Sequence, residues 1–203
     1  SPYSQLTFNV NVSGDLIRSP KKLNTFLTLI ATAHLPSNKK LQIEIVEDSF
    51  EVEDHVLEDF FARLRSMNVN VFIDDFGLGF SSIDRLLTLP VYGVKLDSIF
   101  VSGLGEYEPK KRNFLEAIVK ALSASDLEIV AESIETESQL HWIKTLNVQK
   151  YQGYVLSKPI SLQNMIEFML THETKPKAII PKSKTNTVRL PRFRHFAKQK
   201  LRQ

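Results

Sequence analysis

Seven polar or charged side chains interrupt the apolar segments of this chain, and their types suit metal-assisted chemistry. A strand buried on both faces should be almost continuously hydrophobic, yet each of six Val- and Ile-rich segments carries such a side chain near its carboxyl end. The seven residues are Asn11, Glu44, Asp74, Asp75, Lys95, Glu132 and Gln152. Carboxylate and amide oxygens are ligands that Mg²⁺ and Mn²⁺ prefer, and the set contains no His or Cys for a zinc-type site.

The adjacent carboxylates of Asp74 and Asp75 indicate what bound ions would do. Two buried carboxylates side by side both stay ionised only when a cation lies between them. Two ions ~3.5–4 Å apart, bridged by one carboxylate, are the usual arrangement for in-line attack on a phosphodiester. Lys95 could then orient the attacking water or stabilise charge on the phosphate. The set therefore indicates metal-dependent phosphodiester chemistry.

Each of these residues also has an ordinary structural explanation when it is taken alone. Asn11 could be a buried amide bonded to the backbone, and Glu132 could be a carboxylate at a helix N-terminus. Asp74 and Asp75 could belong only to a glycine-rich turn, and Gln152 alone indicates almost nothing. It is the placement of all seven at successive strand ends that favours a common site.

The segments between these residues predict an α/β fold built from βα units around a parallel sheet. Strands are expected at 6–12, 41–46, 70–74, 92–96, 127–131 and 149–154. Helical spacing of apolar residues recurs over 56–64 and 115–122. In a (β/α)8 barrel all strand carboxyl ends meet at one face, which is where such enzymes place their active sites. That architecture would bring the seven residues together.

Helix boundaries are marked by capping residues. Thr136 and Gln139 fit a capping box, and Ser161 is expected to begin the last helix. A short helix should begin near Ser81 and end at Pro90.

Composition excludes several classes of protein. The chain has 203 residues, of which 42% are hydrophobic and 24% charged, as in ordinary globular proteins. It has no cysteine, which rules out disulfides, zinc-thiolate sites and a Cys nucleophile. No apolar run approaches the ~18 residues needed to cross a bilayer, and the first residues do not resemble a signal peptide. A cytoplasmic location is expected.

Charge divides the chain into an acidic part, residues 1–172, and a basic extension, residues 173–203. The extension holds ten of the 26 Lys and Arg residues and one of the 23 Asp and Glu residues, which leaves a net charge of −6 on residues 1–172. Phe193 and Phe196 lie among the basic residues, so the extension could bind nucleic acid, anionic lipid or an acidic partner. We expect a solvated extension and no nucleic-acid partner, because no RNA-binding motif accompanies the charge.

Longer stretches around the seven residues resemble the EAL-type cyclic-di-GMP phosphodiesterases, a bacterial family with a TIM-like (β/α)8 barrel. The segment FIDDFGLGFSSIDRLLTLPVYGVKLDSIFV at 72–101 is the most specific. The others are NVNVSGDL at 9–16, IEIVEDS at 43–49, IVAESIETESQL at 129–140 and YQGYVLSKPI at 151–160.

The resemblance implies hydrolysis of cyclic di-GMP, a bacterial second messenger, to linear pGpG with two Mg²⁺ or Mn²⁺ ions. It gives Lys95 and Glu132 catalytic roles and Gln152 a role in ligand binding. The ions would be held by Asn11, Glu44, Asp74, Asp75 and Glu132.

The resemblance also implies partners. The loop at 76–82, which follows the family's fifth strand and is supported by Glu47, would form a homodimer. An upstream sensory or GGDEF-type domain would regulate the protein, and a segment outside this chain could anchor it at the inner membrane.

Departures from the family pattern leave an alternative function open. The Glu-Ala-Leu motif of the family's first strand is absent from these 203 residues, so the first two βα units of a barrel that typically needs ~250 residues are missing. Leu78, Ser98 and Ser133 replace residues that are usual in the family. We expect the chain to be part of a longer enzyme, and the alternative is a catalytically silent receptor or interaction module.

Overall fold

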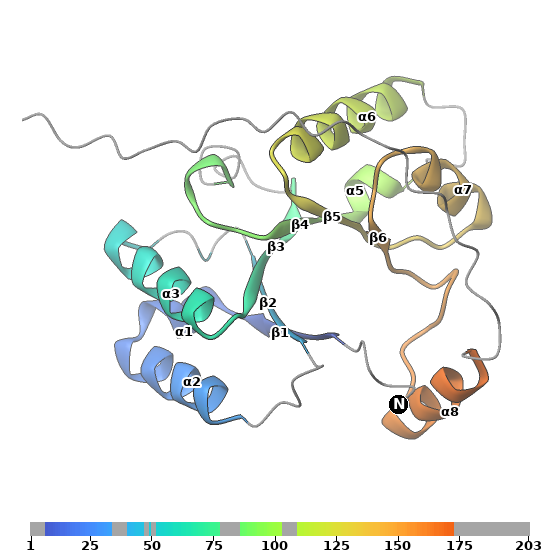
Figure 1. The fold of residues 1–203 in the computed structure, drawn as a ribbon. Coiled ribbons are helices and arrows are strands. Elements are labelled where there is room, and N and C mark those ends of the chain that lie inside the picture. Colours follow the sequence, from blue (N-terminus) through green and yellow to red (C-terminus); the bar gives the residue numbers. More distant parts are fainter. Residues whose placement is uncertain are drawn as a thin grey trace, which may run out of the picture.

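Six parallel strands form one sheet in which every strand pairs with its neighbours in sequence, in the order β1 to β6. The computed structural model describes residues 7–33, 40–46, 49, 52–77, 86–102 and 109–172. The strands are β1 (Thr7–Val12), β2 (Lys40–Val46), β3 (Asn70–Phe76), β4 (Gly93–Leu96), β5 (Glu128–Ala131) and β6 (Lys150–Tyr151). The sheet curls into part of a barrel, so the predicted parallel α/β architecture is confirmed (Figure 1).

Helices lie around the outer side of the curled sheet, except the last one, which lies apart from the strands at the open side of the curl (Figure 1). They are α1 (Gly14–Arg18), α2 (Pro20–Thr32), α3 (Asp54–Ser66), α5 (Ser98–Val101), α6 (Pro109–Ala124), α7 (Glu137–Thr145) and α8 (Leu162–His172). The apolar face predicted for α3 is buried at Leu57, Phe60 and Leu64, and that of α6 at Leu115 and Val119. None of the described helices combines the length and the apolar character needed to cross a membrane.

Alternation along the strands separates the hydrophobic core from the polar inner face. In β2, Ile43 and Ile45 are fully buried in the core that the helices cover, while Gln42 and Glu44 occupy the alternate positions. The core lies between the sheet and its helices, and the inner face is left free to carry polar groups. Because the polar side chains share the inner face of the sheet, the candidate site forms there.

The predicted helix starts are confirmed where they are described. Gln139 N donates to Thr136 Oγ1 at 3.2 Å and Thr136 N donates to Gln139 Oε1 at 3.0 Å, which completes the capping box. Asn164 N donates to Ser161 Oγ at the start of α8. Residues 86–88 are helical, but the start of that helix near Ser81 lies outside the described residues.

The last strand is shorter than predicted. β6 ends at Tyr151 because the chain turns at Gly153, where φ is +157° and the main chain packs against the loop after β5. A Cβ at Gly153 would lie 2.1 Å from the carbonyl oxygen of Ile134, so only glycine fits this approach. Glu47, Leu78 and the basic extension 173–203 lie outside the described residues.

Candidate active site

Lys95 lies at the centre of a buried cluster of carboxylates. Its Nζ atom donates hydrogen bonds to Glu44 Oε2 and Asp74 Oδ1, each at 2.8 Å, and lies 2.7 Å from Glu132 Oε1. The four side chains are only 6% to 14% exposed. They come from β2, β3, β4 and the position after β5, so four neighbouring strands bring them together.

Asn11 on β1 extends this cluster. Its amide group lies 3.2 Å from Glu44 Oε2 and 3.2 Å from Asp74 Oδ2, and with the nitrogen turned toward them it donates a hydrogen bond to each. The pairing of Asn11 with Glu44 in the sheet register places the two side chains at the same level of the inner face. With the oxygen turned the same way, the amide could instead join the carboxylates as a ligand of a cation.

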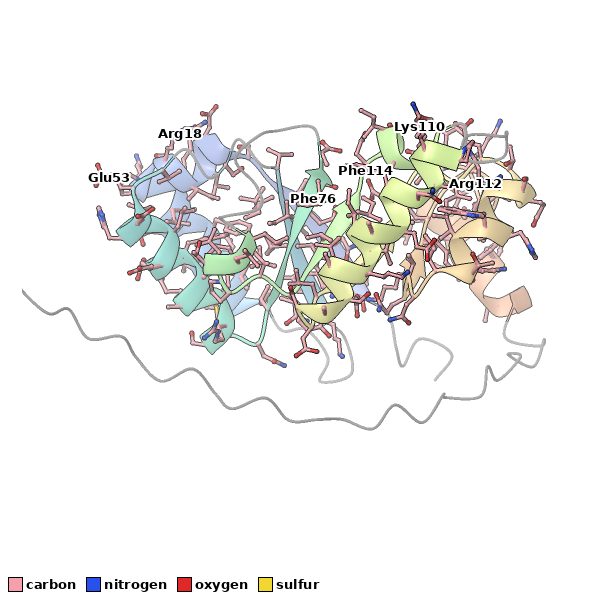
Figure 2. All side chains as sticks on the ribbon, turned by 90° about the horizontal axis from the view of Figure 1, so that it is seen from above. Arg18, Glu53, Phe76, Lys110, Arg112 and Phe114 are labelled. Atoms are coloured by element: carbon pink, nitrogen blue, oxygen red, sulfur yellow. The ribbon has the colours of Figure 1, made fainter. Side chains whose placement is uncertain are left out.

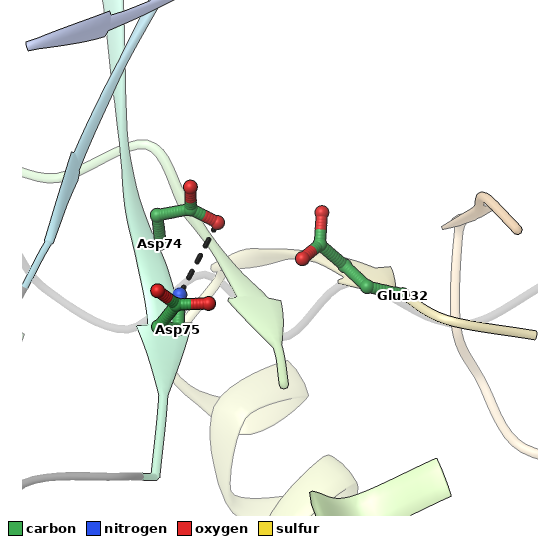
Figure 3. A group of neighbouring side chains, drawn as sticks. All are labelled: Asp74, Asp75 and Glu132. Atoms are coloured by element: carbon green, nitrogen blue, oxygen red, sulfur yellow. Dashed lines mark hydrogen bonds between the residues drawn. The ribbon is translucent and has the colours of Figure 1, made fainter. Parts of the chain in front are cut away.

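Asp75 reaches the cluster through an irregularity in β3. Consecutive side chains of a regular strand point to opposite faces, so Asp74 and Asp75 should diverge. The pairing of β3 with β4 shifts between Ile73 and Phe76, and Asp75 adopts a left-handed backbone with φ of +53°. As a result, ligand oxygens of Asp74, Asp75 and Glu132 all lie within 4.8 Å of one another (Figure 3).

The cluster changes the proton affinities of two of its members. Burial opposes the positive charge of Lys95, but the contacts with Asp74, Glu132 and Glu44 outweigh it and hold the pKa of Lys95 above its ordinary value of 10.5. Burial also raises the pKa of Glu132 above 4.5, and the charge of Lys95 only partly offsets this. Lys95 therefore stays cationic at neutral pH and acts as a hydrogen-bond donor.

The donor set fits a divalent cation such as Mg²⁺ or Mn²⁺. Asp74, Asp75, Glu132, Glu44 and Asn11 offer only oxygen ligands. Glu132 Oε1 is buried and lies 2.7 Å from Lys95 Nζ, and no other donor among the described residues bonds to it. A buried carboxylate oxygen with spare coordinating capacity is what a metal ligand requires.

Gln152 lies in a pocket beside the cluster. The pocket has a volume of about 620 Å³ and is lined by residues after β5, residues after β6 and residues of α8. The main chain of Gln152 is fixed, because its N donates to Ala131 O at 2.9 Å and its O accepts from Ile134 N at 3.2 Å. Gln152 thus lines this pocket and, within the described part of the chain, is not among the residues that contact Lys95.

Sequence reasoning missed several residues that line this pocket. Glu135, Tyr154, Lys158 and Phe168 contribute polar and aromatic groups to its wall. The segment after Gln152, with a glycine, an aromatic residue and a Lys-Pro pair, was the available indication. Ser133, which also lines the pocket, has a left-handed backbone with φ of +55°, which explains why a glycine would be the usual residue there.

Comparisons with known proteins place the sequence among related ones. The family model described as "EAL domain" matches residues 2–159. The chain is 31% identical over 129 residues to the Cyclic di-GMP phosphodiesterase NbdA of Pseudomonas aeruginosa, covering 64% of this chain and 16% of NbdA. It is 28% identical over 163 residues to RocR, a Cyclic di-GMP phosphodiesterase of the same organism, covering 80% of this chain and 41% of RocR.

A solved structure gives the same result for the fold. The crystal structure of the EAL domain of Mycobacterium smegmatis DcpA superposes with a TM-score of 0.72 at 29% identity, covering 80% of this chain and 72% of that domain. The chain therefore spans most of an isolated domain of this kind, but well under half of the curated relatives named above.

Proposed function

The chain belongs to the EAL domain family, and we propose that it hydrolyses cyclic di-GMP to linear pGpG with the help of Mg²⁺ or Mn²⁺. The observation that carries the proposal is the buried carboxylate cluster. Lys95 contacts Glu44, Asp74 and Glu132, and the last two also form a group of neighbouring ligand oxygens with Asp75. The names of NbdA and RocR support the substrate and the reaction. The assignments of individual residues below are part of the proposal.

The acidic centre by itself repels a phosphodiester. Four carboxylates lie near one another, and Lys95 is the one cationic side chain in contact with them among the residues that the structure describes, so an anionic substrate needs further positive charge. Asn11, Glu44, Asp74, Asp75 and Glu132 would hold one or two divalent ions there. Such ions supply Lewis-acid polarisation of the phosphate and acidify a water molecule.

Lys95 and Glu132 then act on the water and the phosphate. Lys95 stays protonated because of its carboxylate neighbours, so it donates a hydrogen bond to the attacking water or to a phosphate oxygen and does not serve as a base. Glu132 Oε1 has capacity to accept one further hydrogen bond or to coordinate, which suits it to orient the water. Burial of both side chains keeps this alignment rigid.

The neighbouring pocket suits a nucleobase of the substrate. Tyr154 and Phe168 offer aromatic surface on which a flat ring can stack. Glu135 can accept hydrogen bonds from the N–H groups of a guanine edge, while Lys158 and Gln152 can donate to its oxygen and nitrogen acceptors. The proximity of this pocket to Glu132 through Ser133 would place the adjoining phosphate over the acidic centre.

Homodimerisation and regulation by other domains are also proposed. Leu87 and Phe114 are 68% and 61% exposed, and both follow the loop after β3 along the chain. Large exposed apolar side chains of this kind support a contact with a second copy. The greater length of NbdA and RocR supports a regulatory domain elsewhere in the full protein. The full protein would act in the cytoplasm, on an intracellular messenger.

Hydrolysis is tested by incubating the 203-residue chain with cyclic di-GMP and Mn²⁺ or Mg²⁺ and separating the products by chromatography. We expect pGpG from the wild type and a loss of at least a hundredfold in Asp74→Ala, because this residue contacts both Lys95 and the other carboxylates. Lys120→Ala is the control, since Lys120 is exposed on α6. Absence of turnover with both metals in the wild type would contradict the proposal.

The second candidate function is binding of cyclic di-GMP without hydrolysis. It is favoured by Ser133, whose left-handed backbone directly follows Glu132 and is unfavourable for a residue other than glycine. Calorimetric binding of cyclic di-GMP with no pGpG formed would select this function.

A further inference from the structure

The turn that follows Asp75 is packed against an aromatic ring. Gly77 has φ of +108°, in the region that favours glycine. A Cβ at Gly77 would lie 2.2 Å from Phe100 Cε2 and 2.3 Å from Phe100 Cζ, so the ring lies directly against the main chain. The close approach joins the end of β3 to α5, although the two residues are far apart in the sequence.

Phe100 is held in place from several sides. Its N donates to Asp97 O at 3.1 Å, and Asp97 caps α5 by accepting from Ile99 N at 2.8 Å. Its ring is largely buried and stacks on Phe114 of α6, with centroids 6.4 Å apart and planes inclined by 22°. Figure 2 shows Phe114 on α6 beside the end of β3 that carries Phe76.

The geometry of the metal ligands depends on the same short segment. If residues 74–77 relaxed to a regular strand, Asp75 would point to the face opposite Asp74 and Glu132. The hydrogen bond from Asp75 N to Asp74 Oδ1 is local and partly buried, so it is a weak restraint on the turn. From other elements, Phe76 pairs with Leu96 of β4 and its O accepts from Asp97 N at 3.5 Å, and Phe100 is the side chain that packs directly on Gly77.

We propose that Phe100 is a positioning residue that holds Gly77, and with it the bulge, so that Asp75 faces Asp74 and Glu132. The inference rests on the proposed role of these carboxylates as metal ligands. It adds a residue that touches neither metal nor substrate and acts through the main chain. Loss of the flat ring would allow the segment to straighten and separate the ligands.

The test compares Phe100→Leu with Ile99→Ala in the 203-residue chain. Leucine keeps an apolar side chain but removes the ring, while Ile99 is a half-exposed neighbour on the same short helix and serves as the matched control. Mn²⁺ binding is followed by the electron paramagnetic resonance signal of the free ion. Amide hydrogen exchange of residues 70–77 is measured without metal, with residues 23–32 of α2 as the internal reference.

We expect Phe100→Leu to weaken Mn²⁺ binding at least tenfold and to speed exchange in residues 74–77, while α2 and Ile99→Ala behave like the wild type. Gly77→Ala should weaken Mn²⁺ binding as well. In the Gly77→Ala background, Phe100→Leu should weaken Mn²⁺ binding by less than it does in the wild type, because both changes act on one contact. Mn²⁺ affinity within twofold of wild type and unchanged exchange in Phe100→Leu would overturn the proposal. So would equal effects of Phe100→Leu and Ile99→Ala.

The two proposals fail in different ways. If the wild type binds Mn²⁺ but does not hydrolyse cyclic di-GMP, the proposed reaction is contradicted. The role of Phe100 is then still decided by the Mn²⁺ affinity of Phe100→Leu relative to the wild type. If the wild type does not bind Mn²⁺, the exchange rates of residues 74–77 decide whether Phe100 holds the turn.

Discussion

Replacing Lys95 with methionine should destabilise the metal-free protein severely. Lys95 Nζ lies 2.7 to 2.8 Å from three carboxylate oxygens, and the four side chains are nearly inaccessible to water. Removing one partner of a buried ion pair costs ~3–5 kcal/mol, because the remaining charges are left uncompensated. A typical domain has a free energy of unfolding of ~5–15 kcal/mol, so the loss would be a large part of the total.

The change is measured by urea unfolding at pH 7.5 in EDTA, with Trp142 fluorescence and circular dichroism as probes. With an m-value of ~2 kcal/mol/M, the midpoint of Lys95→Met should fall by ~1.5–2.5 M urea. Lys120→Met is the matched control. It breaks the exposed pair with Glu116 at 2.7 Å, which should cost only ~0.3–0.5 kcal/mol.

The pH dependence has a definite sign. The pKa of Glu132 is already raised by burial, and removing the charge of Lys95 removes the interaction that lowers it. A buried carboxyl with a raised pKa destabilises the fold when it is ionised, and this effect disappears as the pH falls and the group takes up a proton. The deficit of Lys95→Met should therefore be largest at pH 7.5 and smaller at pH 5. A deficit below ~1 kcal/mol at pH 7.5, or one that grows on acidification, would refute the reasoning.

Two further predictions concern Glu132 and the residue after it. Glu132→Gln should raise the urea midpoint of the metal-free protein at pH 7.5, since burial raises the pKa of this carboxyl. The gain should shrink on acidification and vanish below the ordinary Glu pKa of 4.5, where the carboxyl is protonated in both the folded and the unfolded state. The same variant should bind Mn²⁺ more weakly, and a lower midpoint at pH 7.5 would contradict the prediction. Ser133→Gly should stabilise the protein by up to ~1 kcal/mol, because φ of +55° penalises serine but not glycine. Thermal unfolding checks this, and a lower melting temperature would show that the backbone is not strained there.

Local patterns in the sequence were sufficient to predict the six strands, several of the helices and the positions of the candidate site residues along the strands, but not the helices α1, α2 and α5. The strands, the buried faces of α3 and α6 and the capping box of Thr136 follow from periodicity and from short-range hydrogen bonding. The strand-end positions of Glu44, Lys95 and Glu132 follow from polar residues that break apolar runs. These features depend on neighbours in the chain, which the sequence displays directly.

Tertiary structure decided which way the side chains point and which of them meet. Regular alternation would have separated Asp75 from Asp74, and only the bulge and the left-handed turn bring both toward Glu132. The turn depends on the approach of Phe100 to Gly77, a contact between distant parts of the chain. Gln152 follows a strand like the others, but it lines a pocket and does not contact Lys95. The direction of a side chain depends on such long-range packing, which the pattern of residues along the sequence does not show.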